Sequence, residues 1–357
     1  MQLGICVASK INDIDYVVRA EELGYDSAWL ADSQMIWSDV YASLAVAAHR
    51  TSRIRVGTGV AVAATRPAPV TAAAIASINQ LAPGRTFLGI GTGNTAMRIM
   101  GHKPMTMAAF DDYLTALSPL LRGEEVDYEW RGRSSPVRHI MANDGFVNFS
   151  DEVPVYVSGF GPKSLGLAGK HGHGAVLSVP PHASFMERVW TGIERGAADH
   201  GRSLDRSDFF TCSLTTIVVL DDGETVDSAR VKAQCGAFAI ASLHYTYDQF
   251  RNFGKVPTAG PIAAIWDEYR AVVEATPEDR RHQRVHAGHN CWVLPEEERF
   301  VTKELIEATC LVGTRDQLIE RLRDLRDAGL DQVMILPPLE PRYEVLETVG
   351  TEILPYL

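Results

Sequence analysis

The sequence contains few cysteines and no long apolar run. Its five cysteines form an odd set without a Cys-x-x-Cys pair, which argues against a disulfide framework and a zinc knuckle. The longest apolar runs, such as residues 60–64 and 217–220, have the length of a strand and are too short to span a membrane. The N-terminus lacks the basic region and apolar core of a signal peptide. We therefore predict a cytoplasmic protein with reduced thiols and no membrane partner. The cysteines are Cys6, Cys212, Cys235, Cys291 and Cys310.

Positive charge is also scarce. The chain has 34 lysines and arginines against 45 acidic residues, a net charge of -11, and no basic stretch interleaved with aromatic residues. Such a chain repels nucleic acid and anionic membranes, so we expect neither as a partner. With 46% hydrophobic and 22% charged residues, the 357-residue chain can bury a full core. We predict one domain, residues 1–357, that acts on a small molecule.

Short apolar runs alternate with helical patterns along the chain. This alternation is typical of parallel strands joined by helical crossovers, because parallel neighbours cannot be connected by a tight turn. Eight strands are the number that closes a barrel, so we predict an α/β fold of the (β/α)8 TIM-barrel class. An open doubly wound sheet is the alternative. The eight predicted strands are residues 3–7, 28–30, 55–62, 86–90, 155–158, 175–179, 210–220 and 332–336.

Local signals mark helix ends and two insertions. Gly24 and Gly329 follow helical patterns at similar junctions and predict left-handed helix stops. Thr314 is the expected N-cap of a helix over residues 315–328. Residues of about 122–153 are typical of a hairpin-like insertion, and residues 243–309 form a longer one. Because long loops in compact domains are usually lids or binding elements, we place the second insertion over the barrel mouth as the substrate region.

Three glycine-bearing segments coincide with predicted strand ends: Gly-Thr-Gly-Val at 57–60, Gly-Ile-Gly-Thr-Gly-Asn at 89–94, and Ser-Gly-Phe-Gly-Pro-Lys-Ser at 158–164. None completes the G-x-G-x-x-G fingerprint of dinucleotide-binding folds. Each could be an ordinary tight turn. Together they indicate a cofactor site, because missing Cβ atoms leave room for a flat ring and phosphates.

The third segment is the best candidate for binding a phosphate. It joins a strand to a helix that we expect to begin at Pro162, where proline suits the first turn and free amides face an anion. An ordinary helix cap is the alternative. The residues of this predicted cradle are Ser158, Gly159, Phe160, Gly161, Lys163 and Ser164, with Ser178 from the next strand end.

Several segments, taken together, resemble the luciferase-like superfamily. They are Ala-Glu-Glu-Leu-Gly-Tyr-Asp-Ser-Ala-Trp-Leu-Ala-Asp at 20–32, Val-Gly-Thr-Gly-Val at 56–60, Thr-Arg-Pro-Ala-Pro at 65–69, Leu-Ala-Pro-Gly-Arg at 81–85 and Leu-Gly-Ile-Gly-Thr-Gly at 88–93. The similarity covers most of the chain except residues 122–150 and 243–309. It is greatest to the deazaflavin branch, which uses coenzyme F420 and includes methylenetetrahydromethanopterin reductase and F420-dependent glucose-6-phosphate dehydrogenase.

The resemblance implies a role for several matching residues. Asp32 would lie beside the cofactor. Gly59 and Val60 would form a bulge with a non-prolyl cis peptide that backs the tricyclic ring. The run from Gly159 to Gly161, with Lys163 and Ser164, would hold the phosphate. Trp37 matches an aromatic residue near the cofactor, although a buried core indole is the alternative.

Two departures from the sugar-phosphate dehydrogenase bear on mechanism. That enzyme carries histidine where this chain has Ser33, and glutamate where it has Asn94, so we do not expect the same activity. Asn94 cannot exchange a proton at neutral pH, but its amide can orient a carbonyl, an imine or the edge of the cofactor. We predict Asn94, Ser33 and His289 as catalytic residues.

His282, His286 and His289 lie four and three residues apart, a spacing that would place all three on one face of a helix and could bind a metal. Gly288 favours a loop instead. We therefore predict no metal site. His286 and His289, with Trp37, are expected to face the substrate, and His289 to act as a hydrogen-bond donor or general acid.

These observations predict an oxidoreductase that transfers a hydride between reduced F420 and a small organic substrate with a C=C, C=N or C=O bond. The first alternative is an FMN-dependent monooxygenase supplied by a separate flavin reductase. The second is a barrel that binds a flavin without turnover. We expect a homodimer, because cyclic pairs are the commonest assembly of soluble enzymes.

Overall fold

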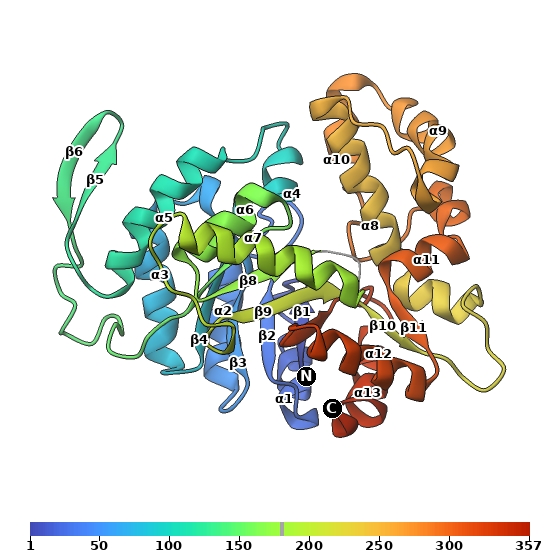
Figure 1. Ribbon diagram of the computed structural model, residues 1–357, viewed down its shortest axis with the longest axis horizontal. Helices are drawn as coiled ribbons and strands as arrows, with labels where there is room; N and C mark the ends of the chain where they lie inside the picture. The colour runs from blue at the N-terminus through green and yellow to red at the C-terminus, as the bar shows by residue number, and fades with distance from the viewer. Residues whose placement is uncertain (179–181) are drawn as a thin grey trace.

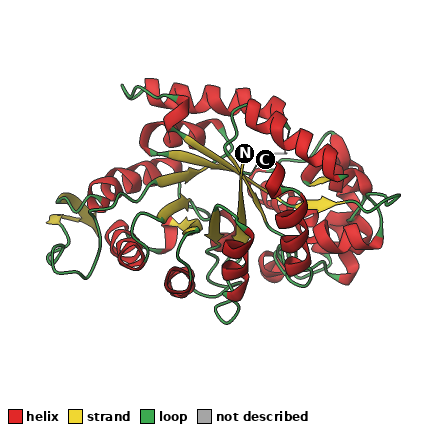
Figure 2. Ribbon diagram, turned by 90° about the horizontal axis from the view of Figure 1, so that it is seen from below, coloured by secondary structure: helices red, strands yellow, loops and turns green. Residues whose placement is uncertain are grey.

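In the computed structural model, which describes residues 1–178 and 182–357, eight parallel strands close into a barrel in the order β1-β12-β9-β8-β7-β4-β3-β2. Figure 2 shows the strands at the centre with helices around them. The predicted TIM barrel is confirmed, and the open sheet is wrong. The barrel strands are β1 (Gln2–Val7), β2 (Ser27–Leu30), β3 (Arg55–Val62), β4 (Thr86–Gly91), β7 (Val155–Ser158), β8 (Gly174–Leu177), β9 (Phe210–Thr215) and β12 (Gln332–Ile335).

Helices cover the outside of the barrel and bury one apolar face each. Helix α12 starts where the sequence predicts, because the Thr314 side chain accepts the Gln317 amide in a capping box. Gly24 and Gly329 both have φ of 92° and end their helices as expected. The surrounding helices are α1 (Asp15–Leu23), α2 (Val40–Arg50), α3 (Ala68–Leu81), α5 (Met107–Leu121), α6 (Pro162–His171), α7 (Met186–Ala198), α12 (Arg315–Asp327) and α13 (Arg342–Glu352).

Aromatic side chains fill the barrel interior. The rings of Trp29 and Phe87 lie 4.3 Å apart between centroids, and Tyr156 and Phe210 pack on the same cluster. The Trp29 indole N–H donates to Gln332 Oε1 at 2.8 Å, so the buried polar atom is satisfied. The interior is therefore a packed core, and a ligand has to bind at the strand ends.

Two predicted strands end earlier than the sequence suggests. The run 210–220 divides at Thr216: β9 stays in the barrel, whereas β10 (Ile217–Val219) pairs with β11 (Leu311–Gly313) outside it. All residues from 211 to 219 except Leu214 are buried, so the apolar run gives no sign of the change of partner. β8 ends at Leu177, and Val179, the last residue of the predicted strand 175–179, lies outside the described residues.

The first insertion contains the predicted hairpin. Strands β5 (Val126–Trp130) and β6 (Arg133–Val137) pair antiparallel and project from the barrel at the left of Figure 1. The two turn residues, Arg131 and Gly132, have φ of 53° and 78°. Positive φ at both positions is the geometry of the tight hairpin turn that matches strand twist.

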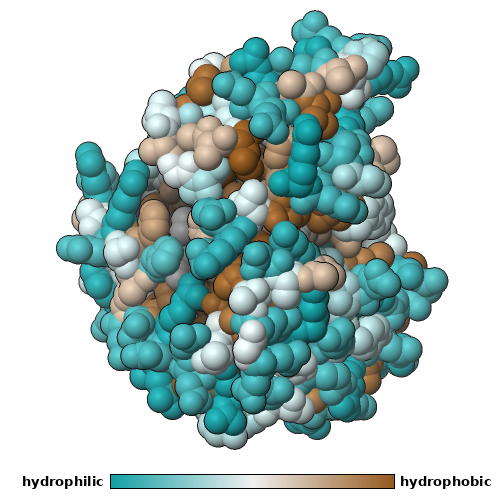
Figure 3. All heavy atoms as spheres, turned by 90° about the vertical axis from the view of Figure 1, so that its right-hand side faces the viewer, coloured by the Kyte–Doolittle hydropathy of each residue, from teal (hydrophilic) through white to brown (hydrophobic). Residues whose placement is uncertain are grey.

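The second insertion is a helical lobe with its own apolar core, coloured yellow to orange beside the barrel in Figure 1. It begins at Ala229, earlier than the predicted position 243, because the long helix α8 starts there. Figure 3 views this side, where hydrophilic side chains dominate the outer surface and apolar ones gather in the hollow across the face. Across the described residues, no helix has the length and apolar character that crossing a membrane requires. The lobe's helices are α8 (Ala229–Phe253), α9 (Gly260–Glu274), α10 (Arg281–Arg284) and α11 (Lys303–Thr309).

Candidate active site

The predicted cofactor residues follow five strands that are neighbours in the barrel, β2, β3, β4, β7 and β8. Because all strands are parallel, their carboxyl ends meet at one face, the face where barrel enzymes place their sites. The structure therefore brings these residues to one arc of the barrel mouth. They are Asp32 after β2, Gly59 and Val60 in β3, Asn94 after β4, Ser158 to Ser164 at the end of β7, and Ser178 after β8.

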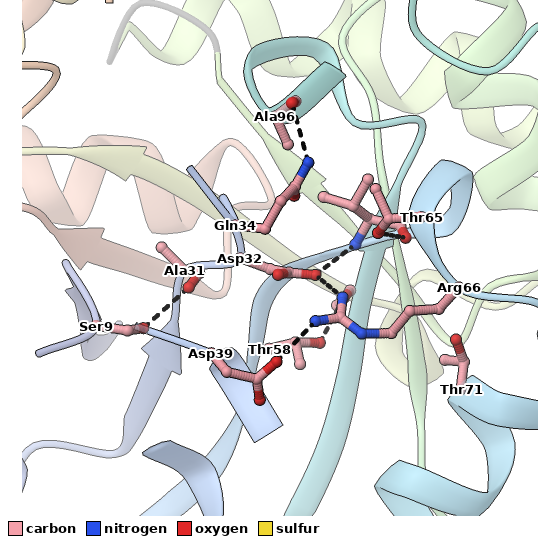
Figure 4. Close-up of polar contacts among 12 residues, drawn as sticks. Ser9, Ala31, Asp32, Gln34, Asp39, Thr58, Thr65, Arg66, Thr71 and Ala96 are labelled. Atoms are coloured by element: carbon pink, nitrogen blue, oxygen red, sulfur yellow. Dashed lines mark hydrogen bonds and ion pairs between the residues drawn. The ribbon is translucent and has the colours of Figure 1, made fainter. Parts of the chain in front are cut away.

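Asp32 is buried and acts as an anchor for the end of β3. Its Oδ2 accepts the Val62 amide at 3.0 Å and the Arg66 guanidinium at 2.5 Å, as Figure 4 shows. Arg66 also reaches the exposed carboxylate of Asp39 at 3.2 Å. Burial raises the pKa of Asp32, and the charge of Arg66 opposes that rise. Arg66 belongs to the segment at 65–69 that resembles the family, but no role was predicted for it from the sequence.

Asp32 and its partners position the bulge in β3. The pairing of β3 with β4 shifts register between Thr58 and Ala61, and the peptide bond between Gly59 and Val60 is cis, as the resemblance implies. Val60 remains partly exposed and packs against the aromatic cluster inside the barrel. This bulge presents Val60 at the barrel mouth between Asp32 and the end of β4.

Three of the strand-end glycines do not leave room for a cofactor, so that prediction is wrong for them. A Cβ on Gly57 would lie 2.3 Å from the Phe87 ring, one on Gly59 2.6 Å from Trp29 Cβ, and one on Gly89 2.3 Å from the carbonyl oxygen of Thr58. The barrel's own atoms occupy the space, so these glycines permit close packing of strands and aromatic rings. They do not open a cofactor cavity.

The start of α6 keeps the geometry that a phosphate site needs. The helix begins at Pro162 with Gly161 as N-cap, as predicted. Among residues 1–178 and 182–357, no atom lies nearer to a Cβ on Gly161 than Ser164 Oγ, at 3.9 Å, so these residues leave the approach open. The first-turn amides of Lys163 and Ser164 have no intrahelical partner and carry the positive end of the helix dipole.

In the predicted phosphate cradle, one polar side chain caps the helix and two others are exposed to solvent. Ser164 Oγ accepts the Gly161 amide at 3.2 Å and donates to the Gly161 carbonyl at 3.0 Å, so its hydroxyl is engaged in the cap. Lys163 and Ser178 are exposed. Phe160 packs edge-on against Tyr245 of α8 with 5.5 Å between ring centroids, so the helical lobe contacts the cradle.

The loop after β2 also contacts the lobe. The Ser33 carbonyl accepts the amides of Ile36 and Trp37 and thereby closes a turn. The half-buried Trp37 donates its indole N–H to Cys291 Sγ at 3.3 Å, and its ring lies 6.3 Å from that of His289. Trp37 and His289 are thus brought together, whereas the Ser33 side chain is buried.

Asn94 is the first residue of α4 (Asn94–Arg98), which follows Gly93 at φ 81°. The Gln34 amide ties this short helix to the β2 loop by donating to the Ala96 carbonyl at 3.1 Å (Figure 4). Asn94 itself is partly exposed. Its amide is therefore available to a ligand at the mouth, in agreement with an orienting role.

The structure regroups the histidines. His282 lies apart, beside Gly101, whereas His286 and His289 lie with His244 of α8, which the sequence analysis missed. Burial lowers the pKa of His289 well below its usual value, so at neutral pH it can donate a hydrogen bond but does not carry the second proton of a general acid. His286 is buried against Asp248 and does not face an open surface.

The closed parallel barrel, with the predicted cofactor residues at the carboxyl ends of its strands, defines a protein of the TIM-barrel class. A family model described as luciferase-like monooxygenase matches residues 10–332. The chain therefore belongs to the luciferase-like monooxygenase family.

Individual relatives agree with this assignment. The chain is 28% identical over 355 residues to a 5,10-methylenetetrahydromethanopterin reductase of Archaeoglobus fulgidus, which covers 98% of this chain and 96% of the relative. Two solved structures share the fold. An F420-dependent secondary alcohol dehydrogenase with an F420-acetone adduct covers 99% of this chain and 98% of its own at TM-score 0.69 and 17% identity. The oxygenating constituent of 3,6-diketocamphane monooxygenase of Pseudomonas putida, in complex with FMN, has the same coverage at TM-score 0.61 and 17% identity.

Proposed function

We propose that the protein transfers a hydride between reduced F420 and a small organic substrate with a C=C, C=N or C=O bond. The arc of candidate residues at the carboxyl ends of five neighbouring strands carries this proposal. Similarity over 96% of the chain to an F420-dependent glucose-6-phosphate dehydrogenase, at 25% identity, supports F420 as the cofactor. The approach that the described residues leave at Gly161, next to first-turn amides without an intrahelical partner, fits a phosphate-bearing cofactor.

When bound, the deazaflavin supplies or accepts the hydride. The protein's own groups then have a positioning task. Val60 would support the ring, Asp32 would keep the β3 bulge in place, and the start of α6 would hold the phosphate. Asn94 and neutral His289 would donate hydrogen bonds to the substrate, and Trp37 would form an apolar wall beside it.

The phosphate assignment is tested by Gly161→Asp with Gly161→Asn as the matched control. Both side chains suit a helix N-cap, so neither should impair folding. The carboxylate would repel a phosphate where the amide would not, and we expect F420 affinity to fall at least about tenfold in the aspartate variant only. Fluorescence titration with F420 measures this effect. Equal affinity in both variants would show that α6 does not bind the phosphate.

An FMN-dependent monooxygenase is the second candidate, because a structure with the same fold binds FMN. Parallel titrations with F420 and FMN distinguish the two. Tight binding of FMN alone, with oxygen consumption when a flavin reductase supplies reduced FMN, would replace our proposal. Binding of either cofactor without turnover across a panel of carbonyl, imine and enone substrates would favour a non-catalytic barrel. We consider this alternative because Ser33 and Asn94 stand where the related dehydrogenase has acid/base residues.

A further inference from the structure

Three histidines from distant parts of the chain converge in the helical lobe. His244 comes from α8, and His286 and His289 follow α10. One ring nitrogen of each lies within 4.8 Å of the others. His244 and His286 are only 2% and 5% exposed, whereas His289 is partly exposed and its ring lies 6.3 Å from that of Trp37. Two of the three histidines are therefore buried, and the third is partly accessible.

Hydrogen bonds leave lone pairs pointing into this cluster. His286 Nε2 donates to Asp248 Oδ2 at 3.1 Å, which leaves Nδ1 as an acceptor. That Nδ1 is buried and has no hydrogen-bond partner within residues 1–178 and 182–357. His244 Nε2 faces Glu297 Oε1 at 3.6 Å, so its proton belongs on that side, and its Nδ1 faces His289 Nδ1 at 3.3 Å. An unpaired buried acceptor is costly unless something binds it.

The separations of the ring nitrogens are also compatible with a bound metal ion, although the 3.3 Å between His244 Nδ1 and His289 Nδ1 equally suits a hydrogen bond when no ion is bound. Tetrahedral Zn–N bonds of about 2.1 Å place neighbouring ligand nitrogens about 3.4 Å apart. The nitrogens of His244 and His289 already have this separation. Because all the separations are within 4.8 Å, the widest pair has to close by at most roughly 1.4 Å to reach it, which rotation of an imidazole can supply.

The surroundings have the second-shell pattern of a histidine metal site, in which carboxylates orient the ligating imidazoles. Asp248 holds His286, and Glu297 faces His244. Each carboxylate is balanced by a guanidinium, because Arg98 pairs with Asp248 and Arg284 with Glu297. A neutral set of three imidazoles selects Zn²⁺ or a similar first-row divalent ion over Ca²⁺ and Mg²⁺, which require oxygen ligands.

We propose that His244, His286 and His289 bind one Zn²⁺-like divalent ion through one ring nitrogen each, with a fourth position open beside the partly exposed His289. The ion would join α8 to the segment after α10, which also contacts Trp37 of the barrel. From the sequence we predicted no metal site. His244 is far from the other two histidines in the sequence, so their spacing could not reveal it as a third ligand. It does not depend on which cofactor the barrel binds.

The test uses full-length protein freed of metal with a chelator and titrated with Zn²⁺ alone by calorimetry, and with Co²⁺ followed by visible absorption. We expect a 1:1 stoichiometry and the intense visible bands of tetrahedral Co²⁺. His244→Asn, His286→Asn and His289→Asn should each weaken Zn²⁺ binding at least about 100-fold. His282→Asn, from the same segment but outside the cluster, should leave binding unchanged.

The hydrogen bond from His286 to Asp248, which orients the imidazole, can be tested independently of the ligands. Asp248→Asn keeps the ligands and should weaken Zn²⁺ binding about 10- to 100-fold. Zn²⁺ should also raise the melting temperature of the unmodified protein and of His282→Asn. This measurement remains valid even if the variants at His244, His286 and His289 fail to fold. The proposal is overturned if unmodified protein binds Zn²⁺ at well below one equivalent, or if the three ligand variants bind it as tightly as His282→Asn.

Discussion

Asp32 illustrates how a residue can be found by its family pattern while its physical role comes from contacts that the pattern does not contain. The resemblance placed it beside the cofactor. In the structure its oxygen Oδ2 is already shared by the Val62 amide and Arg66. The carboxylate therefore fixes the backbone of β3 next to the bulge at Gly59 and Val60.

This role predicts a stability difference between two aspartates that share one arginine. Asp32→Asn leaves the largely buried Arg66 without its closest anion and should lower the free energy of unfolding by about 3 kcal/mol. Asp39→Ser removes an exposed partner but keeps an N-cap oxygen for α2, so the loss should stay below about 1 kcal/mol. Denaturant unfolding measures both. Similar losses in the two variants would contradict a dominant role for the buried pair.

Glu224 gives a pH-dependent prediction. The hydrogen bond from Arg230 lowers the pKa of Glu224 from 4.5 to about 2. A lowered folded-state pKa means that the stabilisation is complete above pH 4.5 and is lost as the pH falls toward 2. Glu224→Gln should therefore destabilise the protein by about 1 kcal/mol at pH 7 and by roughly half of that or less at pH 3. Urea unfolding at the two pH values checks this, and an equal loss at both would refute the ion pair as the cause.

The residues that sequence reasoning missed share a physical feature: their partners are distant in the chain. His244 lies 45 residues from His289, and Asp248 lies 38 from His286. No periodicity links such positions, because tertiary packing of the lobe alone brings them together. Gly161 could be placed from sequence because it lies between a predicted strand and a predicted helix, whereas Asn94 and Trp37 were assigned through the family resemblance, and the roles of all three stay predictions.

At the scale of elements, prediction succeeded where the signal is local. Pro162 after Gly161 fixed the start of α6, and Thr314 fixed that of α12, because capping involves residues within one turn. Prediction failed at Thr216, where the chain leaves the barrel sheet to pair with β11. Both strands that meet there are buried, so hydrophobicity cannot show which neighbour each one has.

The hairpin turn offers an element-scale test. Arg131 has a positive φ that a non-glycine residue rarely adopts, whereas asparagine tolerates it. Arg131→Asn should raise the local stability of β5 and β6 by about 0.5 kcal/mol and so slow their amide exchange. Gly132→Val should lower the local stability by at least about 1 kcal/mol and so accelerate the exchange. Exchange measured by mass spectrometry reports both. Unchanged exchange in the valine variant would mean that the hairpin adopts another turn.

For the whole molecule, the number of strands could be predicted because the αβ unit recurs, whereas the extent of the lobe could not. α8 packs against residues of the lobe itself, and its helical pattern resembles that of a barrel helix. The lobe has its own core around Tyr247, Trp266 and Phe300, separate from the barrel core. Separate cores allow separate local opening.

Two core substitutions test that separation. Trp266→Ala should cost about 3–5 kcal/mol and should raise amide exchange in α8 and α9 while the barrel strands stay protected. Phe87→Ala, at a similarly buried position in the barrel interior, should expose the strands instead. Hydrogen exchange resolved by segment makes the comparison. If Trp266→Ala deprotects both regions equally, the lobe and the barrel unfold as one cooperative unit.

The short pair of β10 and β11 has a consequence for how the molecule can change. The lobe leaves the chain after Val219 and rejoins it at Leu311, and these two strands of three residues lie side by side. Val219 and Leu311, between which the lobe and its connecting segments lie, are therefore separated by roughly 8 Å, while β9 and β12 pair directly with each other in the barrel. A gene segment encoding another lobe could be exchanged at this junction without interrupting the barrel.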